Sequence, residues 1–348
     1  MRLTCILTVA LVFAVVAHSL AAEEPESAGG SGVRREWPEW HGPNRDNVSP
    51  ETGLLKEWPE GGPQLLWTAS GCGKGYSTVS IAGGTIYTAG KVGDETLVFA
   101  FDLNGHLQWK SPNGTSWKAS EDTRWARGYD GSRATPTVDD GLVYHLNETG
   151  NLAAFDAGTG KKVWSLNVLE KFGAKLSMYG CAESVLIDGN NLLCYPGGSK
   201  GYMVALDKKT GQVVWANQDS GDPAAYCSPV LVEFGGVRQI VTMTAEAVIG
   251  VEAGTGELLW RYEHTNGRKI NAVTPLYEDG YVYATLRYGA GGVLLRLKAS
   301  EGQVEAEKVW GERTSGQPAR RRGAGGWVHL RQRSSEERVV LPRFPHGS

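Results

Sequence analysis

The sequence predicts an all-β protein that folds as a β-propeller, and three observations lead to this expectation. Glycine accounts for 47 of the 348 residues, beside 12 Trp and 13 Tyr, which favours tight turns and aromatic packing over long helices. A hairpin pattern recurs at intervals near 50 residues, a spacing typical of solenoids and propellers. Strand and turn signals alternate along the chain, whereas helical repeats would need long helices that are poor in glycine.

The recurring hairpin is the clearest predicted element. A short apolar strand runs into Asp or Glu, a polar turn ends in Gly, and a second strand ends in Trp four residues after that Gly. The Gly supplies the positive φ of the turn, and the acidic side chain can accept hydrogen bonds from turn amides. The second strands are apolar at successive positions, which predicts covered sheet faces with Trp packed between blades. The copies are AFDLNGHLQW (100–109), AFDAGTGKKVW (154–164), ALDKKTGQVVW (205–215) and GVEAGTGELLW (250–260).

A second strand pair precedes each hairpin, so that each repeat supplies four antiparallel strands, as a propeller blade does. A degraded fifth hairpin ends at Trp310, and a half-blade, QLLW, ends at Trp67. About five to six blades are therefore visible, and an intact protein is expected to have seven or eight. The upstream strand pairs span 78–87, 134–144, 181–193, 228–241 and 274–283.

The N-terminus has the features of a secretory signal peptide. Arg2 is followed by an apolar run over 3–17 and by the small-residue stretch SLAA at 19–22. This run is shorter than the roughly 20 residues that a membrane span needs. We expect a cleaved signal over 1–22, a disordered linker over 23–36, a propeller over 37–315 and a periplasmic or secreted location without a membrane span.

The last part of the chain departs from the strand and turn rhythm. Residues 316–348 contain seven Arg and two Glu, so the rest of the chain is acidic although the formal net charge is only −3. We interpret this tail as translated out of frame or as the mark of a truncated gene model; the alternative is a genuine disordered basic tail. An acidic body without a basic stripe argues against nucleic acid as a partner.

Four cysteines remain after the expected cleavage, an even number in a compartment where disulfides form. They are Cys72, Cys181, Cys194 and Cys227. Cys181 and Cys194 flank one predicted hairpin and could pair, but four cysteines allow three connectivities and buried free thiols fit equally well.

The hairpins of the type AFDAGTGKKVW and ALDKKTGQVVW resemble the repeat of pyrroloquinoline-quinone-type (PQQ-like) β-propellers. The segment WPEWHGPNRDNVSPETGLLKEWPEGGPQLLW (37–67) is similar to the opening of secreted bacterial members, of a kind found in planctomycetes. The resemblance covers about 37–312 and predicts the fold more strongly than the activity, because this superfamily includes both dehydrogenases and non-enzymatic scaffolds such as the assembly lipoprotein BamB.

The resemblance implies two functions. The first is a scaffold that binds a protein partner or a small ligand at the propeller face, without a cofactor. The second is an alcohol or polyvinyl-alcohol-type dehydrogenase with PQQ and calcium, for which Asp130 and Glu183 would be the first carboxylates to test. The sequence lacks the adjacent cysteine pair of quinoprotein dehydrogenases and a C-x-x-C-H haem site, and this favours the scaffold.

An unusual insertion, SEDTRWARGYDGSR (120–133), lies between a strand-ending Trp and the next blade. Guanidinium forks and aromatic faces in such a loop can bind an anionic or sugar-like ligand or a partner chain, or can fasten neighbouring blades together. Its candidate binding residues are Arg124, Trp125, Arg127, Tyr129 and Arg133. Equivalent positions before other blades, expected to line the axis, are Tyr76, Tyr179, Glu183, Tyr226 and Asn271. The histidines are dispersed without zinc-site spacing, so we expect no metal site.

Overall fold

The computed structural model describes residues 36–119, 124–312, 327–330 and 339–342. Contacts divide the chain into two units, Met1–Arg35 and Glu36–Ser348. The expected signal peptide and nearly all of the expected linker lie outside the described residues. Of the helical segments in the described ranges, none combines the length and the hydropathy that a membrane crossing requires.

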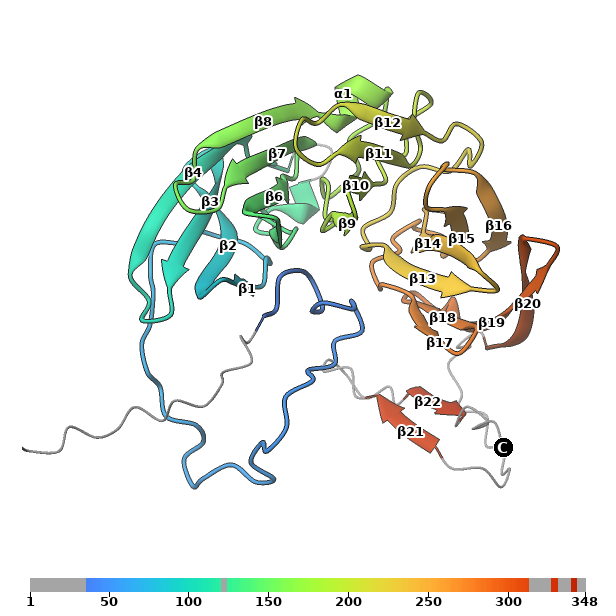
Figure 1. Cartoon of the computed structure of the whole chain (residues 1–348), viewed down its shortest axis with the longest axis horizontal. Coiled ribbons are helices and arrows are strands. Elements are labelled where there is room, and N and C mark those ends of the chain that lie inside the picture. The colour runs from blue at the N-terminus through green and yellow to red at the C-terminus, as the bar shows by residue number, and fades with distance from the viewer. Residues whose placement is uncertain (1–35, 120–123, 313–326, 331–338, 343–348) are drawn as a thin grey trace, which may run out of the picture. The chain divides into compact units, whose positions relative to one another are not determined.

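The described residues contain five four-stranded antiparallel sheets, each made of four strands consecutive in the chain. Figure 1 shows that these sheets, the blades, follow one another in chain order, with the first strand of each innermost and the fourth outermost. The prediction of a β-propeller of four-stranded blades is confirmed. Blade 1 contains β1 (Ser80–Ala82), β2 (Thr85–Val92), β3 (Glu95–Asp102) and β4 (Leu107–Thr115). Blade 2 contains β5 (Thr137–Asp139), β6 (Leu142–Leu146), β7 (Asn151–Asp156) and β8 (Lys162–Asn167).

The remaining blades repeat this plan. Blade 3 contains β9 (Leu186–Asp188), β10 (Asn191–Cys194), β11 (Val204–Asp207) and β12 (Val213–Ala216). Blade 4 contains β13 (Val230–Phe234), β14 (Val237–Met243), β15 (Ala247–Glu252) and β16 (Leu258–Glu263). Blade 5 contains β17 (Leu276–Glu278), β18 (Tyr281–Leu286), β19 (Gly291–Ser300) and β20 (Gln303–Glu312). Two short helices, η1 (Arg124–Ala126) and α1 (Val168–Phe172), lie before and after blade 2.

Hydrophobic layers fill the spaces between consecutive blades. Val98 and Phe155 belong to one buried cluster between blades 1 and 2, and comparable clusters join blades 2 and 3, 3 and 4, and 4 and 5. The middle strands are therefore buried on both faces, as in β6, where Val143 and Tyr144 point to opposite faces and are both fully buried. This agrees with the successive apolar positions of the sequence.

The recurring Trp and Gly meet across the blade boundaries. A Cβ added to Gly160 would lie 2.6 Å from the Trp109 ring of the preceding blade. The indole Nε1 of Trp109 donates to the Ala157 carbonyl, 2.8 Å away. The other three contacts of this kind are Trp67 with Gly105, Trp164 with Gly211 and Trp215 with Gly256. Because the turn lacks a side chain, the indole lies directly on its backbone.

Trp260, the last Trp of the four copies, breaks this arrangement. Its Nε1 donates to Gln239 Oε1 at 2.7 Å within its own blade, rather than to the next turn. The fifth hairpin, which the sequence shows to be degraded, has its Gly302 turn with no atom near the position of a Cβ. Blade 5, whose hairpin departs from the repeated sequence, thus also lacks the contact between a Trp ring and its glycine turn.

Hydroxyl side chains join the innermost parts of four blades. The Thr78 amide donates to Thr135 Oγ1 at 3.1 Å, and the Thr135 amide donates to Ser184 Oγ at 2.9 Å. The Ser184 amide in turn donates to Ser228 Oγ at 2.9 Å. These residues precede the first strand at corresponding places, so a backbone amide before each of blades 1, 2 and 3 is satisfied by a hydroxyl before the next blade.

Two further strands lie in the tail. β21 (Trp327–Leu330) and β22 (Val339–Pro342) pair antiparallel as a separate two-stranded sheet. The rest of 316–348 lies outside the described residues, and the out-of-frame origin of this tail stays a prediction.

Replacing Gly211 with Ala tests the contact between Trp and turn. Gly211 has φ +71° and a Cβ there would lie 2.8 Å from the Trp164 ring, whereas Gly189 in the same blade has φ +59° and open space. Gly189→Ala carries only the cost of the left-handed backbone, on the order of 1 kcal/mol. Gly211→Ala should lose an additional ~1–3 kcal/mol through overpacking. Urea unfolding of both variants measures the difference; equal losses would contradict the close contact between Trp164 and the Gly211 turn.

Candidate functional site

Aromatic rings surround Arg133 where the chain leads into the blades. The guanidinium carbon lies 5.1 Å from the Tyr76 ring centroid, 5.8 Å from that of Trp117 and 5.7 Å from that of Tyr179. We call Arg133 with these three rings the arginine cage. Its members come from the loops before blades 1, 2 and 3, so the ring of blades brings together residues that are distant in sequence.

Backbone carbonyls hold the guanidinium group in the arginine cage. Arg133 Nε donates to the Tyr179 carbonyl at 2.8 Å, and Nη2 donates to the Tyr129 carbonyl. Burial lowers the pKa of Arg133 from its ordinary value, while nearby tyrosines and Glu148 act in the opposite direction. Tyr76 is 51% exposed, so the cage opens to solvent at this residue, whereas Trp117 is buried; the neighbouring Tyr129 is 54% exposed.

Two other predicted site residues, Tyr226 and Asn271, lie in the loops before blades 4 and 5. Tyr226 meets Tyr179 edge to face, with ring centroids 5.9 Å apart. The backbone amide of Tyr226 donates to the Asn271 carbonyl at 2.9 Å. The Asn271 side chain is fully buried and donates to the Thr244 carbonyl at 2.6 Å. Asn271 therefore supports the loop, while the two tyrosines form part of the surface.

The other residues of the 120–133 insertion have separate environments. Arg124 and Arg127 are exposed on the short helix η1 and just after it. The side chain of Trp125 and residues 120–123 lie outside what the structure describes. The Asp130 carboxylate forms an ion pair with Lys91 Nζ at 2.7 Å, and this hydrogen bond holds the pKa of Asp130 below its usual value.

Glu183 is buried beside a small cavity. The residue is 6% exposed, and its Oε2 accepts the Tyr195 amide at 2.9 Å while Oε1 has no partner. The cavity has a volume of about 20 Å³, room for one water molecule, and is also lined by Cys181 and Cys194. Burial raises the pKa of Glu183 to about 8. The structure thus places this carboxyl inside the wall between blades rather than on the arginine cage.

A buried cluster of polar side chains around His145 was not predicted from the sequence. Asn113 Nδ2 lies 2.9 Å from His145 Nδ1, and Ser132 Oγ lies 3.1 Å from Nε2. Because Asn113 Oδ1 accepts from Asn151 Nδ2 at 2.7 Å, the network assigns Asn113 Nδ2 as the donor and His145 Nδ1 as the acceptor. Nε2 then carries the proton and donates to Ser132, so His145 cannot act as a base toward this fully buried serine.

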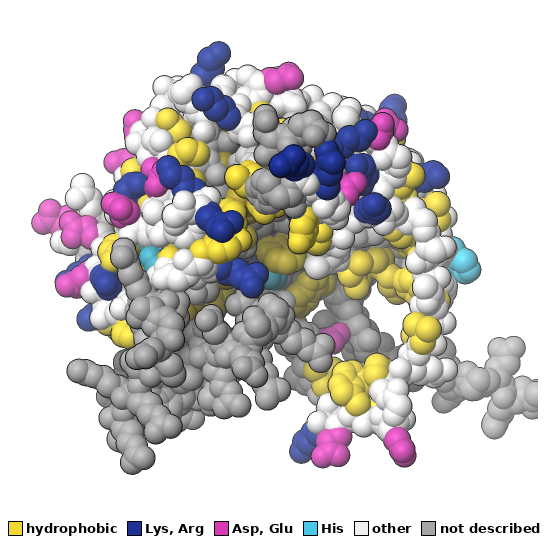
Figure 2. All heavy atoms as spheres, turned by 180° about the vertical axis from the view of Figure 1, so that it is seen from behind, with side chains coloured by type: hydrophobic (Ala, Val, Ile, Leu, Met, Phe, Trp, Pro, Cys, Tyr) yellow, Lys and Arg dark blue, Asp and Glu magenta, His cyan; other side chains and the backbone are white. Residues whose placement is uncertain are grey.

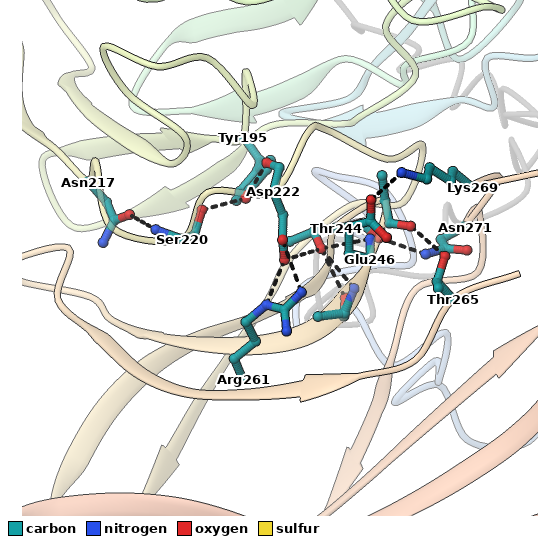
Figure 3. Close-up of polar contacts among 12 residues, drawn as sticks. Tyr195, Asn217, Ser220, Asp222, Thr244, Glu246, Arg261, Thr265, Lys269 and Asn271 are labelled. Carbon is teal, nitrogen blue, oxygen red and sulfur yellow. Dashed lines mark hydrogen bonds and ion pairs between the residues drawn. The ribbon is translucent and has the colours of Figure 1, made fainter.

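A second polar network lies at the boundary of blades 3 and 4. Figure 3 shows Asp222 between Arg261 and Thr244, with both carboxylate oxygens 3.0 Å from Arg261 nitrogens. Thr244 Oγ1 donates to Asp222 at 2.8 Å. Tyr195, which also binds Glu183 through its amide, donates its hydroxyl to the Asp222 carbonyl at 2.9 Å. These contacts anchor the loop that carries Tyr226.

The described residues contain no group of three His, Cys, Asp or Glu side chains arranged to hold a metal ion. Cys72, Cys181, Cys194 and Cys227 are all free thiols rather than disulfides; Cys194 and Cys227 are buried, as the alternative of buried free thiols expected, while Cys72 and Cys181 are partly exposed. Figure 2 shows Lys and Arg side chains interspersed with hydrophobic ones on the face opposite to that of Figure 1.

A family profile described as "Outer membrane protein assembly factor BamB" matches residues 93–341, well over half of the chain. The chain belongs to this family. The match includes four complete blades, from blade 2 to blade 5, and the two strands β21 and β22. The resemblance to PQQ-like propellers is confirmed.

The curated relatives of the chain include quinoprotein alcohol dehydrogenases and BamB proteins. The chain is 29% identical over 143 residues to the quinohemoprotein alcohol dehydrogenase ADH IIB of Pseudomonas putida, covering 38% of this chain and 20% of that protein. It is 29% identical over 174 residues to BamB of Moranella endobia, covering 48% of this chain and 40% of that protein. The matched parts therefore span well under half of these relatives.

Among solved structures, the quinohemoprotein alcohol dehydrogenase from Comamonas testosteroni has a TM-score of 0.50 to this chain at 15% identity. The match covers 80% of this chain and 49% of the dehydrogenase. At this identity the likeness shows that the two proteins share a fold and does not assign an activity to this chain.

The stability of the protein should fall in acid because of His145. Burial lowers the pKa of His145 from 6.5 to about 4, so the unfolded chain binds a proton in this window that the folded chain does not. The contribution of the neutral imidazole is present above pH 6.5 and is lost as the pH falls toward 4, by at most ~1.4 kcal/mol per pH unit. His145→Gln lacks this titration, so the stability gap between wild type and variant should narrow from pH 7 to 4.5 in urea unfolding. A constant gap would refute the assignment.

Glu183 should act in the opposite direction. Its pKa is raised from 4.5 to about 8, so its contribution is present below pH 4.5 and is lost as the pH rises through 8. Glu183→Gln keeps the shape and cannot ionise, so the variant should gain stability relative to wild type between pH 5 and 8.5. Thermal unfolding at several pH values measures this gain, and a pH-independent difference between the two proteins would show that Glu183 does not titrate there.

Proposed function

We propose that this chain is an extracytoplasmic binding scaffold whose arginine cage and adjoining tyrosines receive a protein partner or a small ligand. The observation that carries the proposal is the set of aromatic rings around Arg133, contributed by loops of separate blades, of which Tyr76 is 51% exposed and Tyr179 is partly exposed. Tyr and Arg are the side chains that most often dominate binding interfaces. A periplasmic or secreted location is part of this proposal and rests on the N-terminal sequence.

A second pair of an aromatic ring and a guanidinium group, Tyr288 and Arg268, has the same character as the arginine cage. The Arg268 guanidinium lies 5.0 Å from the Tyr288 ring centroid, and the Tyr288 side chain is 54% exposed. Burial is the main cause that raises the pKa of Tyr179; Tyr288 acts in the same direction and Arg268 in the opposite one. Rings held by guanidinium groups need little further ordering when a partner binds, and this preserves affinity.

The alternative function is a PQQ-dependent dehydrogenase, which the similarity to quinohemoprotein alcohol dehydrogenases favours. The two carboxylates that the sequence offers for it do not fit the role. Asp130 is engaged by Lys91. Glu183 faces a cavity with room for one water molecule, far too small for a tricyclic quinone.

Replacing Tyr76 and Tyr129 with Ser tests the scaffold. These half-exposed rings should contribute at least ~2 kcal/mol of binding, so the double variant should retain about thirtyfold less of any partner that the immobilised wild type captures from periplasmic extract. The matched control is Arg238→Ala, which removes an exposed ion pair with Asp188 on another surface. Partners retained equally by all three proteins would contradict the proposed site.

An activity assay separates the two functions. Purified wild-type protein is incubated with PQQ and Ca²⁺, and dye reduction is followed with primary alcohols. The scaffold predicts no cofactor-dependent reduction. Sustained turnover that requires PQQ would overturn the scaffold and establish the dehydrogenase.

A further inference from the structure

The segment 37–47, WPEWHGPNRDN, lies against the innermost strands of successive blades, on the inner side of the ring in Figure 1. Trp37 and Ile81 exchange backbone hydrogen bonds of 2.8 and 2.9 Å at the first strand of blade 1. The Pro38 carbonyl accepts the Val138 amide of blade 2 at 2.8 Å. The segment therefore begins as an added strand and then crosses to the next blade.

Arg45 continues this path to blades 3 and 4. Its Nη1 donates to the carbonyls of Ser184 and Pro229, each 3.0 Å away, and Nη2 donates to the Val185 carbonyl. These acceptors are 139 to 184 residues away in the sequence. The residue is only 2% exposed, so its whole guanidinium fork is buried in a receptor made of backbone oxygens.

One carboxylate completes the receptor. Arg45 Nε lies 2.6 Å from Glu39 Oε2, and the Glu39 side chain is 14% exposed. A planar guanidinium with donors in fixed directions fits three carbonyls and a carboxylate at once, which the single ammonium of Lys cannot do. The receptor is therefore selective for a guanidinium group rather than for positive charge alone.

The backbone between Trp37 and Asn47 is strained. His41, Arg45 and Asn47 are not glycine, yet have φ values of +66°, +54° and +60°. Residues other than glycine rarely adopt this left-handed backbone conformation, so an isolated segment would not hold it. Turn hydrogen bonds, such as the Asn47 amide to the His41 carbonyl at 2.9 Å, and the docking of Arg45 maintain it together.

We propose that residues 37–47 form an axial plug, an internal peptide ligand whose Arg45 occupies a guanidinium-binding site at the carbonyls of Ser184, Val185 and Pro229. The plug closes the axis at the inner strands and links blades 1 to 4. The site is defined by its chemistry, so a free guanidinium ion should enter it when the Arg45 side chain is removed. This proposal is independent of any partner at the arginine cage.

Chemical rescue of the full-length Arg45→Ala variant tests the proposal. The variant should have a lower thermal midpoint than wild type, and millimolar methylguanidinium should recover most of that loss. The matched control is Arg238→Ala, whose guanidinium is 52% exposed beside Asp188 and whose small loss should not be rescued. Wild type at the same concentration corrects for general effects of the ion.

Arg45→Lys provides a second measurement, and carries the rescue test if Arg45→Ala does not fold. It keeps the charge but cannot reach all four acceptors, so the amides of Ile81, Val138 and Asn47 should exchange hydrogen faster than in wild type. Methylguanidinium should slow this exchange. Wild-type exchange rates in Arg45→Lys, or a response to methylguanidinium no larger than that of Arg238→Ala, would overturn the proposal.

Discussion

The contact of an indole with a bare glycine turn is the interaction on which the ring of blades depends. Trp109, Trp164 and Trp215 each extend from an outermost strand to the turn of the following blade. The indole replaces the missing Cβ as the packing surface, and its N–H satisfies a backbone carbonyl of that turn, as with Trp164 and the Lys208 carbonyl at 2.9 Å. Hydrophobic layers between the sheets can then pack at a constant spacing, because the outer rims are held together.

The fold could be predicted because both halves of this contact recur in the sequence at a constant separation. The positive φ of Gly160 and Gly211 and the burial of successive apolar positions follow from local patterns. The departure of Trp260 from the series could not be predicted, because it depends on Gln239 in a strand whose repeat position is not conserved between the copies. Local periodicity thus specifies the blades, while individual side chains decide the details of each boundary.

The candidate surface was predicted only in part, for a physical reason. Tyr76, Arg133 and Tyr179 occupy corresponding places before their blades, and the ring geometry brings such places together. Burial cannot be deduced from the same correspondence: Glu183 lies between blades and accepts the Tyr195 amide, and Asn271 turns inward to the Thr244 carbonyl. The acceptors of Arg45 lie on other blades, so no spacing in the sequence could have indicated them.

The contacts of the 37–47 segment have a consequence for assembly. Joints made of one indole and one glycine turn are nearly interchangeable, so by themselves they do not distinguish the correct neighbour from another blade or from a blade of a second molecule. Arg45, in contrast, donates to three carbonyls in the segments that lead into blades 3 and 4. The 37–47 segment therefore supplies an asymmetry among blades 1 to 4, which should disfavour exchange of blades between chains during folding.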